Sequence, residues 1–411
     1  MRVELINTGS ELLVGRVLNT HHYWLAQQLT RMGYTLAHQQ VVPDTGEAIQ
    51  AAVREAIAHT ELVIVTGGLG PTGDDLTRQR IAELLDLPLE EHAETRARIT
   101  AYFKNRNRPL RETVFVQAQV PAGATVLRND HGIAPGLALP TPRGWLVLLP
   151  GPPRELRPMF TQAAAPLLAE KLPPENPVII RALKTIGVGE TTVEQNITPV
   201  LSELVAEGLE IGYCARAGEV DVRLTASGEG GVERIAQAEA IIRQKLGPRI
   251  YGVDDEQLEE ILIRKLTASG KTLAVAESCT GGLLAHHLTN VPGASIVFLA
   301  GHCTYSNAAK QNTLGVLPET LAEYGAVSDP VARQMAEGAR AKHSADYALA
   351  TTGIAGPDGG TPEKPVGTIF IACATAEGTD VVNSCFAIDR VTFKQLVVQQ
   401  AMNELRLKIC K

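Results

Sequence analysis

Residues 272–282 read TLAVAESCTGG, and residues 305–310 read YSNAAK. The first five residues are apolar and predict a buried strand, which ends in small and polar residues before a helical pattern starts at Leu283. A serine at such a turn lies among backbone N–H groups that have no partner within the helix and that can stabilise an oxyanion. Ser278 is therefore a candidate nucleophile. Neither motif contains a histidine, so Lys310 is the candidate base, on condition that burial or a neighbouring cation lowers its pKa.

Other interpretations of this motif stay open. Serine and threonine before a helix are commonly N-caps, and a pair of glycines often only permits a tight turn. Cys279 is a rival nucleophile because thiols are intrinsically better nucleophiles than hydroxyls, although cysteine is also commonly buried. The motif is thus compatible with three interpretations: a serine hydrolase, a thiol mechanism and a purely structural capping role.

Composition limits the class of protein. A chain of 411 residues predicts two or three domains. The net charge of −7 argues against a nucleic-acid binder, which usually carries a basic stripe. The six cysteines form no C-x-x-C pair and so give no zinc spacing, and we expect a reducing, cytoplasmic location. No apolar run is long enough to predict a membrane span.

The order of elements predicts an α/β protein with three domains. Residues 1–172 alternate strand and helix patterns, which is typical of a doubly wound parallel sheet covered on both faces. A linker rich in proline, LPPENP, occupies residues 172–177. Residues 178–252 predict a small α+β domain, and residues 253–411 predict a final α/β domain that carries the serine motif. Within the first domain, residues 154–171 predict one continuous helix.

Three loops rich in glycine follow apolar strands of the first domain: NTGSE at residues 7–11, TGGLGPTGDD at 66–75 and LPGPPRE at 149–155. Ligands of parallel sheets bind where such loops converge, because glycines let backbone N–H groups approach phosphate oxygens. The candidate nucleotide-binding residues are Thr8, Gly9, Gly67, Gly68, Gly70, Thr72 and Gly151. Capping and turn formation alone explain any single loop, and it is the three together that favour a binding site.

Acidic residues in these loops suggest a metal. Asp74 and Asp75 would repel a bare phosphate unless a hard divalent cation bridges them, and Glu11 is a further candidate ligand. The hypothesis is therefore a metal-assisted site for a phosphorylated nucleotide. The other interpretation is that the two aspartates are ordinary first-turn residues of a helix.

The motifs together resemble the competence/damage-inducible protein A family, CinA, over nearly the whole chain. The resemblance rests on residues 66–77 (TGGLGPTGDDLT), 149–153 (LPGPP), 277–282 (ESCTGG), 305–310 (YSNAAK), 325–328 (GAVS), 352–357 (TGIAGP) and 364–368 (KPVGT). It implies a first domain with the molybdenum-cofactor-binding fold and ADP-ribose pyrophosphatase activity dependent on a divalent metal. It also implies a KH-type middle domain. The last domain resembles nicotinamide-nucleotide amidohydrolases, which convert nicotinamide mononucleotide to nicotinic acid mononucleotide and ammonia without a cofactor.

The resemblance also implies roles for single residues. Ser278 matches the nucleophile, Lys310 its partner lysine and Tyr305 a site tyrosine that relays or orients protons. The candidate substrate-binding residues of this domain are Thr280, Gly281, Gly282, Asn307, Thr352, Gly353 and Arg390. The chain departs from the family pattern at Ile388, where a glycine is usual, and at Lys394, where an arginine is common.

Two further classes remain. The first domain fits equally a pterin or nucleotide binding module without catalysis, because a fold does not settle a function. The KH-like segment and the family name suggest a competence-related nucleic-acid protein. However, GVGE at residues 187–190 is not the GXXG loop of KH domains, and GEGG at 228–231 is an acidic, partial match.

The motifs and the resemblance together predict the partners of this protein. We expect nicotinamide mononucleotide and ADP-ribose as ligands, no nucleic acid, no membrane and a homodimer.

Overall fold

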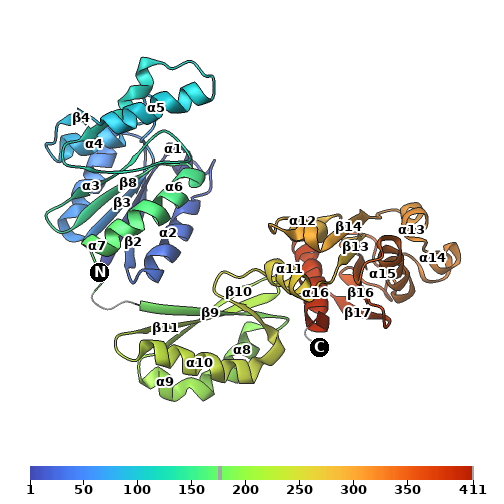
Figure 1. The fold of residues 1–411 in the computed structure, drawn as a ribbon. Helices are drawn as coiled ribbons and strands as arrows, with labels where there is room; N and C mark the ends of the chain where they lie inside the picture. Colours follow the sequence, from blue (N-terminus) through green and yellow to red (C-terminus); the bar gives the residue numbers. More distant parts are fainter. Residues whose placement is uncertain (175–177, 410–411) are drawn as a thin grey trace. The chain divides into compact units, whose positions relative to one another are not determined.

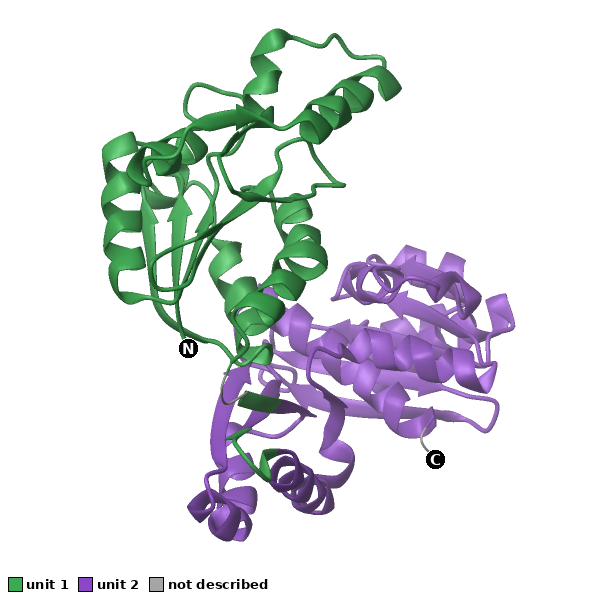
Figure 2. Ribbon diagram, turned by 60° about the vertical axis from the view of Figure 1, so that its left-hand side comes forward, with its two compact units in different colours: residues 1–180, 226–231 green, residues 181–225, 232–411 purple. Residues whose placement is uncertain are grey.

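The computed structural model describes residues 1–174 and 178–409 of the chain (Figure 1). It divides into two compact units, one of residues 1–180 with 226–231 and one of residues 181–225 with 232–411 (Figure 2). Residues 175–177 of the predicted linker lie outside the described residues.

A six-stranded sheet forms the centre of the first domain, in the order β2-β1-β3-β8-β7-β6. Its strands are β1 (Arg2–Thr8), β2 (Thr35–Val42), β3 (Leu62–Thr66), β6 (Thr125–Leu127), β7 (Gly136–Pro140) and β8 (Trp145–Leu149). The first four in this order pair in parallel, and β7 and β6 pair antiparallel at one edge. Strand β3 is buried along its whole length, as its apolar sequence LVIVT requires in a sheet covered on both faces.

Helices cover both faces of this sheet and produce two hydrophobic clusters. Leu25 and Phe160 belong to the cluster on one face, and Ile49 and Ile81 to the cluster on the other. The elements that complete the domain are α1 (Ser10–Leu13), α2 (Thr20–Arg31), α3 (Gly46–His59), α4 (Thr77–Leu84), α5 (Ala93–Asn105), the 3-10 helix η1 (Glu112–Ala118), α6 (Pro153–Met159), the π-helical turn η2 (Phe160–Ala164), α7 (Ala165–Lys171) and the strand pair β4 (Leu89–Glu91) and β5 (Gln119–Pro121). The helix predicted over residues 154–171 is present as the uninterrupted run of α6, η2 and α7, in which η2 is a π-helical turn. Pro158 lies inside α6 and cannot donate a backbone hydrogen bond.

The middle segment contains a four-stranded sheet in the order β10-β11-β9-β12. Its elements are β9 (Val178–Ile186), α8 (Glu190–Ile197), η3 (Thr198–Leu201), α9 (Ser202–Ala206), β10 (Glu210–Arg216), β11 (Glu219–Ser227), α10 (Gly231–Leu246), η4 (Gly247–Arg249) and β12 (Ile250–Val253). Val220, Val222 and Leu224 alternate along β11 and are buried, which is the period of a strand with one covered face. The α+β prediction for this segment is confirmed.

The last domain is built on a five-stranded sheet in the order β14-β13-β15-β16-β17. Its elements are α11 (Leu258–Ser269), β13 (Leu273–Glu277), α12 (Leu283–Thr289), η5 (Ala294–Ile296), β14 (Phe298–Cys303), α13 (Asn307–Leu314), α14 (Pro318–Tyr324), α15 (Asp329–His343), β15 (Tyr347–Gly353), β16 (Thr368–Ala374), β17 (Thr379–Cys385) and α16 (Arg390–Ile409). Strands β14, β13 and β15 are parallel, and β16 and β17 continue the sheet antiparallel. Leu262 of α11 and Val398 of α16 pack on one face, and Met335 of α15 packs on the other.

In both α/β domains the motifs singled out from sequence follow the carboxyl ends of parallel strands. The three glycine loops follow β1, β3 and β8, and the serine and lysine motifs follow β13 and β14. Side chains from separate segments therefore meet at one edge of each sheet. Among residues 1–174 and 178–409, no helix combines the length and the apolarity that crossing a bilayer needs.

Candidate functional site

The turn after β13 holds Ser278 at the edge of the last sheet. The Ser278 N–H donates to the carbonyl of Thr351 on the neighbouring strand at 2.9 Å, which ties the serine to the sheet. Gly281 and Gly282 then adopt φ angles of +62° and +93°, a left-handed conformation that favours glycine. The glycine pair lets the chain reverse from strand to helix within four residues.

Lys310 reaches the same serine from α13. Ser306 caps this helix by accepting a hydrogen bond from the Ala309 N–H at 3.1 Å, and the first turn carries Lys310 inward. The Lys310 side chain is 1% exposed, and Ser278 is 9% exposed. The Lys310 Nζ donates to the Ser278 Oγ at 3.0 Å and to the Thr304 carbonyl at 2.9 Å. The two residues predicted as nucleophile and base are thus in direct contact.

Burial changes the chemistry of this amine. Desolvation lowers the pKa of Lys310 from its ordinary value, because an ammonium loses hydration when it is removed from water. Within the described part of the chain, no carboxylate forms an ion pair with Lys310 that would restore the charge. The lowered pKa favours the neutral form of the amine, and only this form can accept the proton of the hydroxyl that it contacts.

The thiol beside the serine is in the opposite situation. Cys279 is buried, and desolvation raises its pKa to about 12. A thiol is a strong nucleophile only as the thiolate, so Cys279 at neutral pH packs as an apolar side chain. The geometry favours Ser278 over the thiol interpretation.

A residue that sequence reasoning missed accepts hydrogen bonds from several backbone N–H groups of the turn and of the helix that follows it. The buried carboxylate of Glu277 accepts hydrogen bonds from the N–H groups of Gly282, Leu284 and Ala285 at 3.0, 3.0 and 2.9 Å. The Gly281 N–H donates to the Ser278 carbonyl at 3.2 Å. The N–H groups of Gly281 and Gly282 are therefore already engaged and are not free to hold an oxyanion. A glutamate at the end of a strand that a helix soon follows is the signal that could have indicated this capping role.

Two backbone N–H groups remain next to the nucleophile. Among the described residues, the N–H groups of Cys279 and Thr280 have no carbonyl or side-chain partner outside their own residue. The Thr280 side chain is fixed by a 2.8 Å hydrogen bond between its hydroxyl and that of Thr351. These two N–H groups are the best candidates for an oxyanion hole, since donors directly after a nucleophile lie close to the oxygen that develops charge.

Tyr305 is placed differently from its predicted role. Its side chain is 61% exposed, and its hydroxyl accepts a hydrogen bond from Arg390 Nη2 at 2.9 Å rather than contacting the serine or the lysine. Arg390 also donates through Nη1 to the Gly356 carbonyl at 2.9 Å. The Lys394 Nζ lies 3.7 Å from the place where a Cβ on Gly281 would stand. Lys394 of α16 therefore lies near the serine turn, and Arg390 at the start of the same helix holds the tyrosine.

The remaining predicted residues form the wall and the rim of this site. The hydroxyl of Thr352 donates to the Ala326 carbonyl at 2.7 Å, which fixes the end of β15. Gly353 packs so closely that a Cβ there would stand 3.3 Å from the Cys279 sulfur. Asn307, the first residue of α13, is exposed. Thr352 and Gly353 thus belong to the packed end of β15, where Gly353 lies against Cys279 of the turn. Asn307 stays a candidate substrate-binding residue at the surface.

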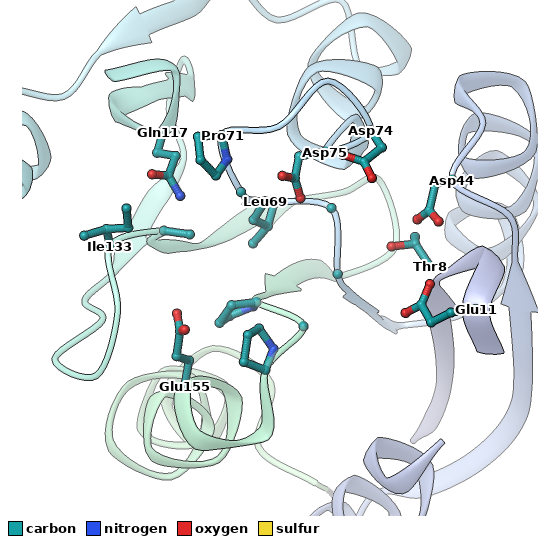
Figure 3. Close-up of a pocket in the computed structure, with 17 residues that line it drawn as sticks. Thr8, Glu11, Asp44, Leu69, Pro71, Asp74, Asp75, Gln117, Ile133 and Glu155 are labelled. Carbon is teal, nitrogen blue, oxygen red and sulfur yellow. The ribbon is translucent and has the colours of Figure 1, made fainter. Parts of the chain in front are cut away.

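The first domain contains a cavity of about 390 Å³ at the carboxyl ends of β1, β3 and β8 (Figure 3). The predicted residues that line it are Thr8, Glu11, Gly67, Gly68, Gly70, Asp74, Asp75 and Gly151. Gly9 and Thr72 are not among the lining residues. Thr72 instead donates its N–H and its hydroxyl to the Asp75 Oδ2 at 2.9 and 2.5 Å and so orients that carboxylate.

Three polar lining residues of this cavity were not among the predicted candidates: Asp44, Gln117 and Glu155. Asp44 follows β2 and accepts a hydrogen bond from the Ser10 N–H at 2.8 Å, so its position at a strand end was a usable signal. Glu155 is the last residue of the third glycine loop and lies in the first turn of α6. Gln117 comes from η1, and nothing in the sequence distinguishes it from other polar residues.

The charged side chains that line the cavity are all acidic. Five carboxylates line it, those of Glu11, Asp44, Asp74, Asp75 and Glu155, and none of its described lining residues is Lys, Arg or His. Among the described residues, no three His, Cys, Asp or Glu side chains form a ready metal cluster. Mg²⁺ usually binds one or two carboxylates together with substrate phosphates rather than a complete protein cage. The chemistry of Asp74, Asp75 and Glu11 is compatible with such a cation, and these residues stay predicted ligands.

Comparison with known proteins covers almost the whole chain. Residues 4–170 match the family of probable molybdopterin binding domains, residues 180–252 the damage-inducible protein CinA KH domain, and residues 255–409 the CinA C-terminal domain. The fold classes expected for the three domains are therefore confirmed.

Full-length relatives agree with these domain matches. A CinA-like protein of Akkermansia muciniphila is 43% identical over 98% of this chain and 96% of its own length. A CinA-like protein of an Anaeromyxobacter species is 40% identical over 100% of this chain and 99% of its own. A crystal structure of a competence/damage inducible protein of Agrobacterium tumefaciens is 40% identical over 38% of this chain and 98% of its own, with a TM-score of 0.35.

Proposed function

The chain belongs to the CinA family of competence- and damage-inducible proteins, and from that premise we propose that its last domain is a serine amidohydrolase that deamidates nicotinamide mononucleotide. The observation that carries this proposal is the 3.0 Å hydrogen bond between the buried Lys310 Nζ and the Ser278 Oγ. A buried lysine with a lowered pKa next to a hydroxyl supplies what a serine nucleophile needs when no histidine is present.

The positions of these atoms support the following reaction. The Ser278 Oγ forms a bond to the carboxamide carbon as Lys310 takes the hydroxyl proton. The N–H groups of Cys279 and Thr280 stabilise the oxyanion of the tetrahedral intermediate. Collapse of this intermediate breaks the carbon–nitrogen bond, and protonated Lys310 gives its proton to the leaving ammonia. Water, deprotonated by Lys310, then hydrolyses the acyl-enzyme to the carboxylate and restores the serine.

Cations near the serine support a substrate that carries a phosphate. Arg390 is held by the Gly356 carbonyl and the Tyr305 hydroxyl, so its guanidinium is positioned in advance. Lys394 adds a second positive charge near Gly281, although an ammonium binds phosphate less directionally than a guanidinium. In this proposal Tyr305 orients Arg390 instead of relaying protons.

Ammonia release from nicotinamide mononucleotide tests the proposal. Wild-type protein should release ammonia without added metal, and Ser278→Ala should reduce kcat by several orders of magnitude. Ser269→Ala is the matched control, because the Ser269 hydroxyl caps a carbonyl of α11 in the same domain. Near-normal turnover by Ser278→Ala would remove the serine from the mechanism.

For the first domain we infer a second activity, metal-dependent hydrolysis of the pyrophosphate of ADP-ribose. The acidic cavity at the ends of three parallel strands carries this inference. A divalent cation bound there would neutralise the phosphates and lower the pKa of the attacking water. The chain's own contribution is to hold Asp75 through Thr72 and to bring glycine backbones close to the phosphates.

Turnover separates this activity from a binding module. Purified protein with Mg²⁺ should convert ADP-ribose to AMP and ribose 5-phosphate, and Asp75→Asn should lose most of this rate. Asp86→Asn, a change on the surface after α4, is the control. Saturable binding of ADP-ribose or a pterin without any hydrolysis would favour the non-catalytic alternative.

A further inference from the structure

We propose that Gln117 and Glu155 form a subsite that recognises the exocyclic amine of adenine and so selects adenine nucleotides in the first domain. The proposal rests on the hydrolytic function inferred for this cavity, and its test is arranged so that the two can fail separately. In Figure 3, Gln117, Ile133 and Glu155 lie on one side of the pocket, and Thr8, Glu11 and Asp44 lie on the opposite side. The carboxylates on that opposite side suit the phosphates with their cation, which leaves this side for the base.

Gln117 presents an amide with an unsatisfied oxygen. Its side chain is 1% exposed and lines the cavity, yet its Oε1 has no hydrogen-bond partner among the described residues. A buried polar atom without a partner lowers stability, so such an atom beside a cavity indicates a ligand that supplies the missing donor. The last side-chain torsion of glutamine is broad, which lets the amide turn its oxygen toward the cavity.

The backbone that carries Gln117 is held firmly. Phe115 and Ala118 of η1 pack with Ile99 of α5 in a hydrophobic cluster of their own. The neighbours of Gln117 on both sides in sequence are therefore anchored. The amide is kept beside the cavity by packing and not by hydrogen bonds of its own oxygen.

The Glu155 carboxylate is the second hydrogen-bond acceptor, and a residue outside the cavity lining orients it. Asn129, which is buried, donates through Nδ2 to the Glu155 Oε2 at 2.8 Å and to the Ala134 carbonyl at 2.7 Å. A Cβ on Gly132 would overlap this Oε2, so the loop wraps the carboxylate closely. Asn129 is thus a positioning residue. The Glu155 Oε1 is left for a ligand, since the exposed Arg154 is only a distant partner at 3.9 Å.

Two acceptors together specify a ligand that carries two donors. The exocyclic amine of adenine has two N–H groups, one for the Gln117 amide oxygen and one for the Glu155 carboxylate, and the Gln117 Nε2 can donate to the adjacent ring nitrogen. Hypoxanthine carries an oxygen at this position and would face two acceptors with no hydrogen. The lining residues Ile133, Ala134 and Pro152 supply apolar surface for the flat ring.

The test compares adenosine with inosine, since these nucleosides lack phosphate and need no metal. Ligand-observed NMR titration of the full-length protein should give an affinity for adenosine about 10- to 100-fold above that for inosine. Gln117→Met keeps the volume, removes the amide and should bring the two affinities close together. Glu155→Gln adds an N–H donor for the hypoxanthine oxygen and should improve inosine binding relative to adenosine. Gln162→Met, at an exposed glutamine of the same domain, should leave the ratio unchanged.

Rates measured in parallel separate the subsite from the reaction. With Mg²⁺, wild-type kcat/KM for ADP-ribose should exceed that for its hypoxanthine analogue by a similar factor, mainly through KM. Equal binding of adenosine and inosine by the wild type would overturn the subsite even if both diphosphates are hydrolysed. A preference for adenosine without any hydrolysis would overturn the proposed reaction and keep the subsite. A pterin that displaces adenosine and binds more tightly would overturn the assignment to adenine.

Discussion

Replacing Lys310 by methionine tests the proposed dyad most directly. Methionine has almost the length and volume of lysine, so the buried space stays filled, but it offers neither a donor nor a base. The Ser278 Oγ then loses its 3.0 Å partner and the Thr304 carbonyl its 2.9 Å partner. A loss of activity in Lys310→Met therefore reports the amine and not a cavity.

The expected effects on rate and on stability differ in size. Loss of a general base typically lowers the rate about 10²–10⁴-fold, and a thousandfold loss is about 4 kcal/mol of transition-state stabilisation. The two lost hydrogen bonds are worth about 1 kcal/mol each, and removing a buried amine offsets part of this because its desolvation is unfavourable. We expect unfolding to become easier by at most about 2 kcal/mol, a fall in Tm of about 4–8 °C. The variant should be folded and nearly inactive.

The assay is ammonia release over a pH series. Only deprotonated Lys310 can accept the serine proton, so wild-type kcat/KM should rise with pH and level off above the pKa of Lys310. Since burial lowers this pKa, the plateau should begin below the ordinary lysine value of 10.5. Lys310→Arg should be inactive throughout, because a guanidinium does not deprotonate in this range.

Lys342→Met is the matched control, since Lys342 also donates to a backbone carbonyl, that of Thr313, but at the surface. It should keep wild-type rates and the same pH profile. If Lys310→Met retained a tenth or more of wild-type kcat/KM while folded, another group would have to be the base. A wild-type kcat/KM that falls as the pH rises toward 10.5, while the protein stays folded, would contradict the lysine mechanism as well.

Four further outcomes follow from the geometry. Cys279→Ala should keep most of the deamidase rate, and the native thiol should resist alkylation at pH 8, because its pKa is about 12; rapid alkylation by iodoacetamide would contradict this. The ring nitrogens of His302 and His343 lie 2.6 Å apart, and burial lowers the pKa of His302 in the folded chain. As the pH falls, His302 is therefore protonated in the unfolded chain before it is protonated in the folded chain. The free energy of unfolding should consequently fall as the pH drops below about 6.5. A His302→Asn variant should show a shallower pH dependence in denaturant titrations, and an identical one would exclude this residue. Gly132→Ala should displace Glu155 and reduce ADP-ribose hydrolysis at least tenfold with deamidation intact, which paired assays would check. Chelation with EDTA should stop ADP-ribose hydrolysis and leave ammonia release unchanged, and equal inhibition of both would argue against a cofactor-free deamidase.

The sequence predicted the parts of the molecule in which local pattern and tertiary structure agree. The apolar run before Glu277 is strand β13, and the apolar run before Gly67 is strand β3. Because parallel strands bring their carboxyl ends together, identifying the strands was enough to expect that their loops converge. Contact between Ser278 and Lys310 could be expected on this ground, since each follows one of two adjacent strands.

Hydrogen-bond partners could not be predicted in the same way. Which backbone N–H groups remain for an oxyanion depends on where the Glu277 carboxylate points, and sequence gives residue types but not side-chain directions. Tyr305 has the spacing of a site residue, yet its hydroxyl bonds to Arg390, which lies 85 residues away. Gln117 lies in a 3-10 helix with no periodic signal, and only packing of that helix brings it to the cavity.

The two proposed functions require phosphate to be bound in opposite ways. In the last domain the proposed phosphate ligands are Arg390 and Lys394, cations fixed to the chain, so our proposal needs no added ion for a nucleotide monophosphate. The first cavity has five carboxylates and no cationic lining residue among those described, so it repels phosphate until a divalent cation is present. The reactions match this difference, because amide hydrolysis places its developing charge on one oxygen that two N–H groups can stabilise. Pyrophosphate hydrolysis spreads charge over several phosphate oxygens, and a mobile dication compensates such charge better than hydrogen bonds alone.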